Sequence, residues 1–198
     1  MSDTFRTIKA ASTGMYKEKG SKFLSFAYPV ENEAEVQNIL DQLKKTYHDA
    51  RHHCYAYILG KDMDIFRAND DGEPHHSAGD PILGQLRSHE LTDILIVVVR
   101  YFGGTKLGVG GLVQAYKTAA AAAIASGEII TKILMTELTI SFAYEAMDQV
   151  MGTISRNDLK ITHQAFGSSC LIKLECRANI QEEVKTLLAA IPLLKTIT

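Results

Sequence analysis

Short apolar runs separated by turn-forming residues predict a sheet in the first two thirds of this chain. These runs cover residues 5–15, 22–29, 54–59, 65–69 and 94–99. The first two are separated by YKEKGS, in which Gly20 suits a turn, and KDMD separates the next two. We therefore expect two hairpins, followed by a strand whose continuous apolar character is typical of a buried position.

Two helices are predicted between these strands. Residues 33–47 carry apolar side chains at three- and four-residue spacing. Asn32 and Glu35 before that stripe have the spacing of a capping box. Asp80 is the expected N-cap of a second helix, which runs from Pro81 to about residue 89.

The strand at 94–99 leads into a glycine-dense turn and a long alanine-rich helix, for which Gly127 is the expected C-cap. Glycines let a backbone approach a ligand closely, and the first amides of a helix lack partners within the helix. The loop is therefore a candidate site for a phosphate or another anion. Its candidate ligand-binding residues are Arg100, Tyr101, Gly103, Gly104, Lys106, Gly108, Gly110 and Gly111, with Lys22 from the opening hairpin.

This loop matches no named nucleotide motif. GGTKLGVGG lacks the GxxxxGK[ST] order, and GVGGLV lacks the third glycine of GxGxxG. In an alternative interpretation, the glycines let the helix around residues 119–123 pack closely against the sheet. The sequence leaves both interpretations open.

A turn-rich segment holds a second candidate cluster, formed by Asp70, Asp71, Glu73 and His75. Carboxylates and imidazoles are metal ligands and acid–base groups. Six of the seven histidines lie between residues 48 and 89, but without HExxH spacing, so we predict no metal site. Alternatively, these acids build the turn and pair with Arg100, because an unpaired charge at the end of an apolar strand is costly.

The pattern restarts after residue 132. The predicted elements are strands at 136–142, 160–166, 170–176 and 194–197, a helix at 144–156, and a last helix capped by Asn179 and Glu182 that ends before Pro192. This order matches the ferredoxin-like split βαβ plan. We therefore expect two domains, residues 1–132 and 133–198.

Composition narrows the class of protein. The 198 residues are 46% apolar and 22% charged, as in folded globular domains. A net charge of −2 argues against coating nucleic acid by bulk charge. Three cysteines fit no disulfide framework or zinc hook. Because the sequence shows no apolar segment of signal-peptide or membrane-spanning length, we expect a cytoplasmic protein without a membrane partner. We also expect no cofactor.

The segments KGSKFL, HHCYAY, DDGEP followed by SAG, and RYFGGTKLGVGGLVQAY occur in this order. Together they resemble the Impact/YigZ family. The bacterial YigZ branch is the better match, because the chain has no room for the extra RWD domain of eukaryotic Impact proteins, which regulate translation. His75 and His76 replace residues that are usually small in the family.

The resemblance implies an α+β protein. Its N-terminal domain would have the ribosomal protein S5 domain 2-like fold with a mixed sheet. Its C-terminal domain would be ferredoxin-like and similar to the last domain of translocation elongation factors.

The leading hypothesis is a non-enzymatic binding or regulatory protein that engages RNA, a nucleotide, the ribosome or a translation factor. Lys106, Arg100 and Lys22 would meet phosphate, and Tyr101 or Phe102 would stack on a base. The alternative is a metal-assisted enzyme that acts on a phosphorylated or acidic small molecule through the acidic cluster. A third hypothesis is a protein-interaction module that uses the sheet of the second domain.

Overall fold

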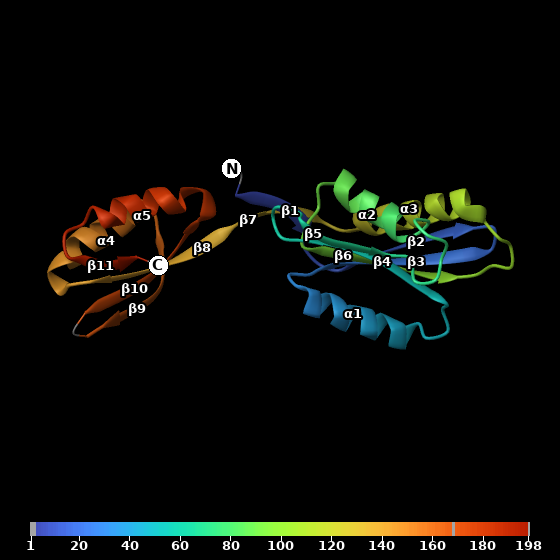
Figure 1. Ribbon diagram of the computed structural model, residues 1–198, viewed down its shortest axis with the longest axis horizontal. Coiled ribbons are helices and arrows are strands. Elements are labelled where there is room, and N and C mark those ends of the chain that lie inside the picture. The colour runs from blue at the N-terminus through green and yellow to red at the C-terminus, as the bar shows by residue number, and fades with distance from the viewer. Residues whose placement is uncertain (1–2, 168, 198) are drawn as a thin grey trace. The chain divides into compact units, whose positions relative to one another are not determined.

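The computed structural model describes residues 3–167 and 169–197. Its contacts divide the chain into two compact units (Figure 1). The larger unit spans Phe5–Lys132, and the smaller one contains the chain from Ile133 onward together with Asp3 and Thr4. Asp3 belongs there because its carboxylate accepts two hydrogen bonds of 2.8 Å from Arg177. That residues 1–132 and 133–198 are separate domains stays a prediction, which separate expression of the two parts would test.

A five-stranded sheet with the order β2-β3-β6-β4-β5 forms the centre of the larger unit. Its strands are β2 (Ser12–Glu18), β3 (Ser21–Pro29), β4 (His52–Leu59), β5 (Ile65–Asn69) and β6 (Ile94–Tyr101). All neighbouring strands are antiparallel, so the expected mixed sheet is wrong. The helical connections from β3 to β4 and from β5 to β6 do join parallel strands, but another strand lies between the members of each pair.

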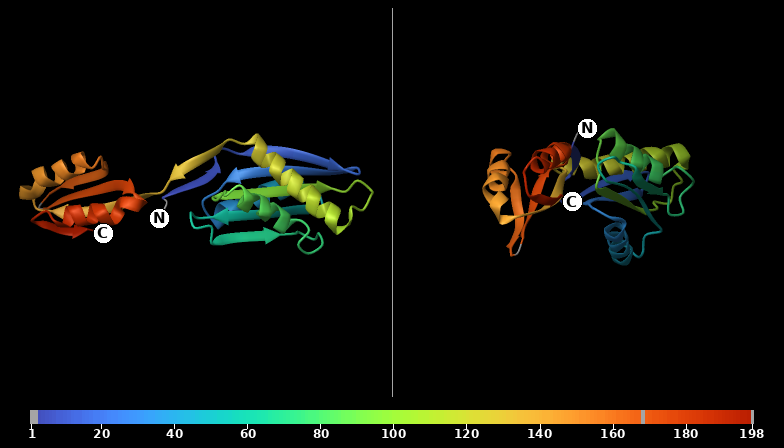
Figure 2. Two further views of the ribbon diagram at one scale, coloured as in Figure 1. Left: turned by 90° about the horizontal axis from the view of Figure 1, so that it is seen from above. Right: turned by 60° about the vertical axis from the view of Figure 1, so that its left-hand side comes forward.

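Helices cover both faces of this sheet. α1 (Glu33–Thr46) lies on one face, and α2 (Gly79–Ser88) and α3 (Gly108–Ser126) lie on the other (Figures 1 and 2). Residues 94–99 of β6 are fully buried between the two layers. Burial on both faces explains why this strand is apolar at every one of these positions instead of alternating.

The opening hairpin differs from its prediction. Residues 5–15 form two strands, β1 (Thr4–Ile8) and the first part of β2, instead of one. β1 pairs with β7 (Ile129–Ile133) in a separate two-stranded sheet. The hairpin consists of β2 and β3, and Gly20 takes a φ of +81° in its turn.

The helix starts confirm one predicted cap and correct another. Asn32 Oδ1 accepts a hydrogen bond from the Glu35 amide at 3.0 Å, which confirms Asn32 as the N-cap of α1. The Glu35 carboxylate reaches back as predicted, but it accepts from the Glu31 amide and the Asn32 side-chain amide instead of the Asn32 backbone amide. Asp80 does not cap α2, because the helix already begins at Gly79. Asp70 instead accepts hydrogen bonds from the Ala78 and Gly79 amides at 3.0 and 2.8 Å.

The smaller unit contains a four-stranded antiparallel sheet with the order β11-β8-β10-β9. Its elements are β8 (Met135–Phe142), η1 (Tyr144–Ala146), α4 (Met147–Arg156), β9 (Lys160–Phe166), β10 (Cys170–Arg177), η2 (Ala178–Ile180), α5 (Gln181–Ala189) and β11 (Leu194–Ile197). Apolar side chains of α4 and α5 pack against the buried face of β8 and β10. The predicted cap at Asn179 is wrong, because a 3₁₀ turn precedes α5 and no side chain caps the helix.

Candidate functional site

A cavity of about 360 Å³ lies at the N-terminal end of α3. It is lined by Glu73, Pro74, Arg100, Phe102, Lys106, Leu107, Gly108, Val109 and Leu112. The fold thus brings together three segments that are distant in sequence: the DDGEP turn, the end of β6 and the glycine loop. The lining combines an apolar wall with two basic side chains and one carboxylate.

Arg100 forms the charged part of this cavity at the end of β6. Its Nη1 donates a hydrogen bond of 2.5 Å to Glu73 Oε1, and only 7% and 4% of the two side chains are exposed. The prediction that Arg100 has a carboxylate partner is therefore confirmed. Its guanidinium also lies 5.4 Å from the ring centroid of Phe23 and 5.7 Å from that of Phe102. Its Nε is buried and hydrogen-bonds to none of the described residues.

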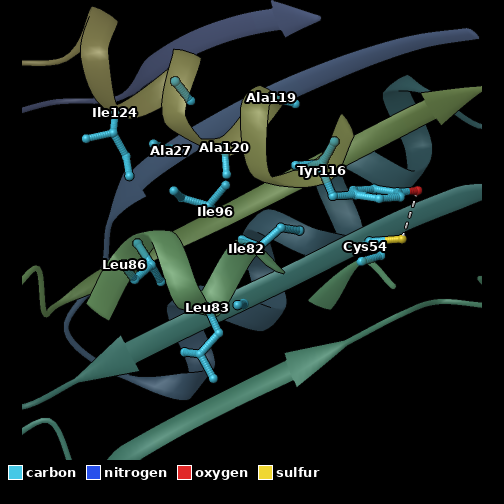
Figure 3. Close-up of a cluster of buried hydrophobic side chains, with 14 of the residues drawn as sticks. Ala27, Cys54, Ile82, Leu83, Leu86, Ile96, Tyr116, Ala119, Ala120 and Ile124 are labelled. Atoms are coloured by element: carbon cyan, nitrogen blue, oxygen red, sulfur yellow. Dashed lines mark hydrogen bonds between the residues drawn. The ribbon is translucent and has the colours of Figure 1, made fainter. Parts of the chain in front are cut away.

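Tyr116 on α3 completes the surroundings of Glu73, and the sequence analysis did not select it. Its hydroxyl donates to Glu73 Oε1 at 2.8 Å, and Cys54 Sγ lies 3.3 Å from that hydroxyl (Figure 3). Burial raises the pKa of both the Cys54 thiol and the Tyr116 hydroxyl, so both stay protonated at neutral pH. Among the buried residues of α3, only Tyr116 has a polar side-chain atom. This hydroxyl group on a helix face of alanines and aliphatic residues was the sequence signal that could have identified Tyr116.

Asp70 and Asp71 of the turn accept hydrogen bonds from backbone amides of the chain. Asp70 accepts hydrogen bonds from three backbone amides, those of His76, Ala78 and Gly79. Burial alone raises the pKa of Asp70, but the amide hydrogen bonds outweigh burial and hold it below its usual value. Asp71 Oδ2 accepts from the His53 amide at 2.7 Å.

His75 is exposed and faces the ring of His76, with 6.0 Å between centroids. Together with Asp70, Asp71 and Glu73 it lines a separate cavity of about 520 Å³. In the described part of the chain, no three His, Cys, Asp or Glu side chains converge in a way that would hold a metal ion. The hydrogen bonds of Asp70 and Asp71 agree with the alternative in which these acids build the turn.

The loop glycines differ in what the fold requires of them. A Cβ at Gly103 would lie 1.9 Å from the backbone of Gly20, so this position needs glycine for close approach. Gly104 and Gly108 have φ values of +88° and +72°, which favour glycine for its backbone freedom. A Cβ at Gly111 would lie 3.0 Å from Leu107 Cβ.

Gly110 is needed neither for close approach of the backbone nor for a positive φ. Its φ is not positive, and an added Cβ would meet nothing within 4 Å. The close approach of α3 to the sheet depends instead on Gly14 of β2, where a Cβ would lie 2.5 Å from the Ala123 amide nitrogen. The interpretation of the loop glycines as packing devices for α3 is therefore wrong at Gly104, Gly108 and Gly110, where the space is open.

The remaining candidate residues lie around the same end of β6. Lys106 is exposed and lines the first cavity. Tyr101 donates its hydroxyl hydrogen bond to Asp49 at 2.8 Å and lines a neighbouring cavity of about 400 Å³. Lys22 pairs with Tyr101 in the sheet register, but it lines none of these three cavities.

Among the residues that the structure describes, no helix has both the length and the apolar character needed to cross a membrane.

Comparison with known proteins places the site in a recognised context. The Impact N-terminal domain family matches residues 19–124, which include the lining of all three cavities. IMPACT family member YvyE of Bacillus subtilis is 35% identical over 150 residues, covering 76% of this chain and 69% of that protein. IMPACT family member YigZ of Escherichia coli is 31% identical over 170 residues, covering 84% and 83%.

A solved structure described as a hypothetical protein matches this fold with a TM-score of 0.73 and 28% sequence identity, covering 99% of this chain and 98% of that one. The family match spans more than half of the chain, and bacterial relatives above 30% identity extend over most of it. The resemblance inferred from the sequence motifs is thus confirmed: the chain belongs to the IMPACT family.

Proposed function

We propose that this chain is a cytoplasmic, non-enzymatic binding protein that engages RNA of the translation apparatus at the N-terminal end of α3. The observation that carries the proposal is the cavity in which Arg100, Lys106 and Phe102 converge on the start of a helix. Basic groups beside an exposed aromatic ring are typical of sites that hold a phosphate and stack a base.

The electrostatics of the helix start favour an anion. α3 is 19 residues long, its N-cap Leu107 makes no side-chain hydrogen bond, and its first turn contains no acidic residue. Its first amides therefore lack both intrahelical partners and a side-chain cap, and the helix dipole adds about half a positive charge at that end. Glu73 balances the charge of Arg100, so the exposed Lys106 is the cation of the loop that is available to a ligand.

The open glycine positions support the same proposal. At Gly104, Gly108 and Gly110 an added Cβ would meet no other atom within 4 Å. Small residues there keep the approach to the first amides of α3 free, as sites that bind phosphate through backbone amides require.

The proposal includes the fold of each unit. We assign the larger unit to the ribosomal protein S5 domain 2-like fold and the smaller unit to the ferredoxin-like fold. The second assignment is supported by the element order βαββαβ and by the central positions of β8 and β10, the first and third strands of that unit. Both folds favour a role with RNA or ribosomes, although the geometry of a site is the stronger argument for its function.

A salt titration of RNA binding tests the proposed function. Fluorescence anisotropy of a labelled single-stranded RNA should show an affinity that falls linearly with the logarithm of salt concentration. Lys106→Ala should weaken binding and reduce the salt slope by about one. Lys117→Ala, which removes an exposed lysine further along α3, is the matched control and should bind like the unchanged protein. Absence of RNA binding at low salt, or equal binding by the two variants, would refute the proposal.

A further inference from the structure

Two cavities meet at the end of β6 and share a wall. The first, of about 360 Å³, is the one at the start of α3. The second, of about 400 Å³, is lined by Asp49, Ala50, Arg51, Arg100, Tyr101 and Phe102. Arg100 and Phe102 line both. Both volumes fall in the range of roughly 300–1,000 Å³ that small-molecule sites occupy.

Phe102 is an exposed aromatic residue on a rigid support. Phe102 is 53% exposed and directly follows the last residue of β6. The Arg100 guanidinium lies 5.7 Å from its ring centroid and is itself held by Glu73 and by the ring of Phe23. One side of the Phe102 ring is therefore fixed by a cation–π contact, while much of the ring stays open to solvent.

The charge around the two cavities is positive, although the whole chain has a net charge of −2. Their linings contain three basic side chains, those of Arg51, Arg100 and Lys106, against the two acidic ones of Glu73 and Asp49. Lys106 belongs to one cavity and Arg51 to the other, so a basic group stands in each. The uncapped start of α3 adds to this excess.

We infer that the ligand is a single-stranded nucleic acid, that one base stacks on the face of the Phe102 ring that Arg100 leaves open, and that the next base lies in the other cavity. This inference rests on the proposed function and specifies its ligand. Phe102 thus separates the base that it stacks on from the neighbouring base, and Lys106 and Arg51 meet the flanking phosphates. In a duplex, separating two base pairs around a side chain costs the energy of unstacking them, whereas unpaired bases stack readily on aromatic side chains.

The first experiment compares strands. Labelled hexanucleotides of single-stranded RNA, single-stranded DNA and the matching RNA duplex are titrated with the full chain at low salt. Single strands should bind at least ten-fold more tightly than the duplex, and binding of either RNA or DNA single strands supports the inference. Duplex binding as tight as single-strand binding overturns it.

The second experiment detects the separation of the two bases. A 2-aminopurine base within the oligonucleotide is quenched by stacking on its neighbour, and its fluorescence should rise on binding when Phe102 separates the pair. Phe102→Ala should abolish this rise and weaken binding roughly ten-fold, because stacking on an aromatic ring contributes that much per base. Phe102→Tyr keeps a ring and should retain both signals.

The matched control is Phe166→Ala, which removes an equally exposed phenylalanine, 55% exposed on β9 of the smaller unit. If the unchanged protein binds oligonucleotides and depends on Lys106, but Phe102→Ala behaves like Phe166→Ala, the inference is wrong and the proposed function stands. If no oligonucleotide binds and an acidic peptide does, both are overturned.

Discussion

The DDGEP turn and the glycine loop line the same cavity but use their polar groups in opposite ways. In the turn, Asp70 and Asp71 accept hydrogen bonds from backbone amides, and Glu73 is paired with Arg100. In the loop, the start of α3 has no side-chain cap, and Lys106 makes no ion pair with any described residue. Polar groups that are bonded internally stabilise a fold, whereas polar groups left without partners are available to a ligand. The comparison therefore assigns stability to the turn and binding to the loop.

The largest expected effect comes from breaking the buried ion pair. Glu73→Ala leaves Arg100 charged, buried and unpaired, which should lower the free energy of unfolding by about 3–5 kcal/mol. Lys106→Ala on the other side of the cavity should change it by less than about 0.5 kcal/mol. Urea denaturation measures both values. Similar losses in the free energy of unfolding of the two variants would contradict the assignment of stability to the turn and of binding to the loop.

A smaller loss is expected at Asp70, the residue that caps α2. Asp70→Asn should cost about 1–2 kcal/mol at neutral pH, because it weakens hydrogen bonds to three backbone amides. Asp80→Asn, an exposed change in the first turn of α2 that affects only a contact with the exposed His76, should stay within about 0.5 kcal/mol. Equal effects in these two variants would contradict the assignment of the cap to Asp70.

The stability difference between Asp70→Asn and the unchanged protein should depend on pH. The folded state holds the pKa of Asp70 below its usual value, so its carboxylate contributes stability above that value. This contribution is lost as the pH falls through the lowered pKa. Urea midpoints measured from pH 7 to pH 3 should therefore converge for the unchanged protein and Asp70→Asn at the acid end.

Substitutions of two loop glycines should test the comparison between turn and loop through a small gain and a small loss of stability. Gly110→Ala fits the backbone and the open space, and alanine is a better helix former, so stability should rise by about 0.5–1 kcal/mol while RNA binding weakens. Gly104→Ala instead forces a side chain into a φ of +88° and should destabilise the fold by roughly 1–2 kcal/mol. Unfolding curves and anisotropy on the same samples provide both readouts. Unchanged RNA affinity in Gly110→Ala would contradict the role assigned to the start of α3.

Local sequence patterns predicted much of the fold. The apolar run of β6, the capping pair at Asn32 and Glu35, and the order of elements after residue 132 can each be recognised within a short stretch of the sequence. The antiparallel sheet was missed because the insertion of β6 between β3 and β4 depends on contacts between distant residues.

The candidate site could be predicted only in part from the sequence. The loop and the paired state of Arg100 follow from the cost of burying charge and from glycine chemistry. The capping role of Asp70 was assigned to Asp80 because only the fold shows that a residue nine positions earlier reaches the Gly79 amide. Phe102 was noted as a base-stacking residue, but the second cavity beside it is also lined by Arg51, which lies 51 positions earlier in the sequence.

The contact between Gly103 and Gly20 has a consequence for engineering. The backbones approach so closely that neither a side chain at Gly103 nor a shift of the hairpin turn is tolerated, and the Gly103 amide also donates to Ser21 Oγ at 3.2 Å. The loop is thus anchored at one end by the hairpin and at the other by the first turn of α3. Between these anchors, Gly104 is fixed by its positive φ and Leu107 packs against the core. Thr105 and Lys106 are therefore the two positions at which exchanged side chains would alter what the protein recognises while its scaffold stays folded.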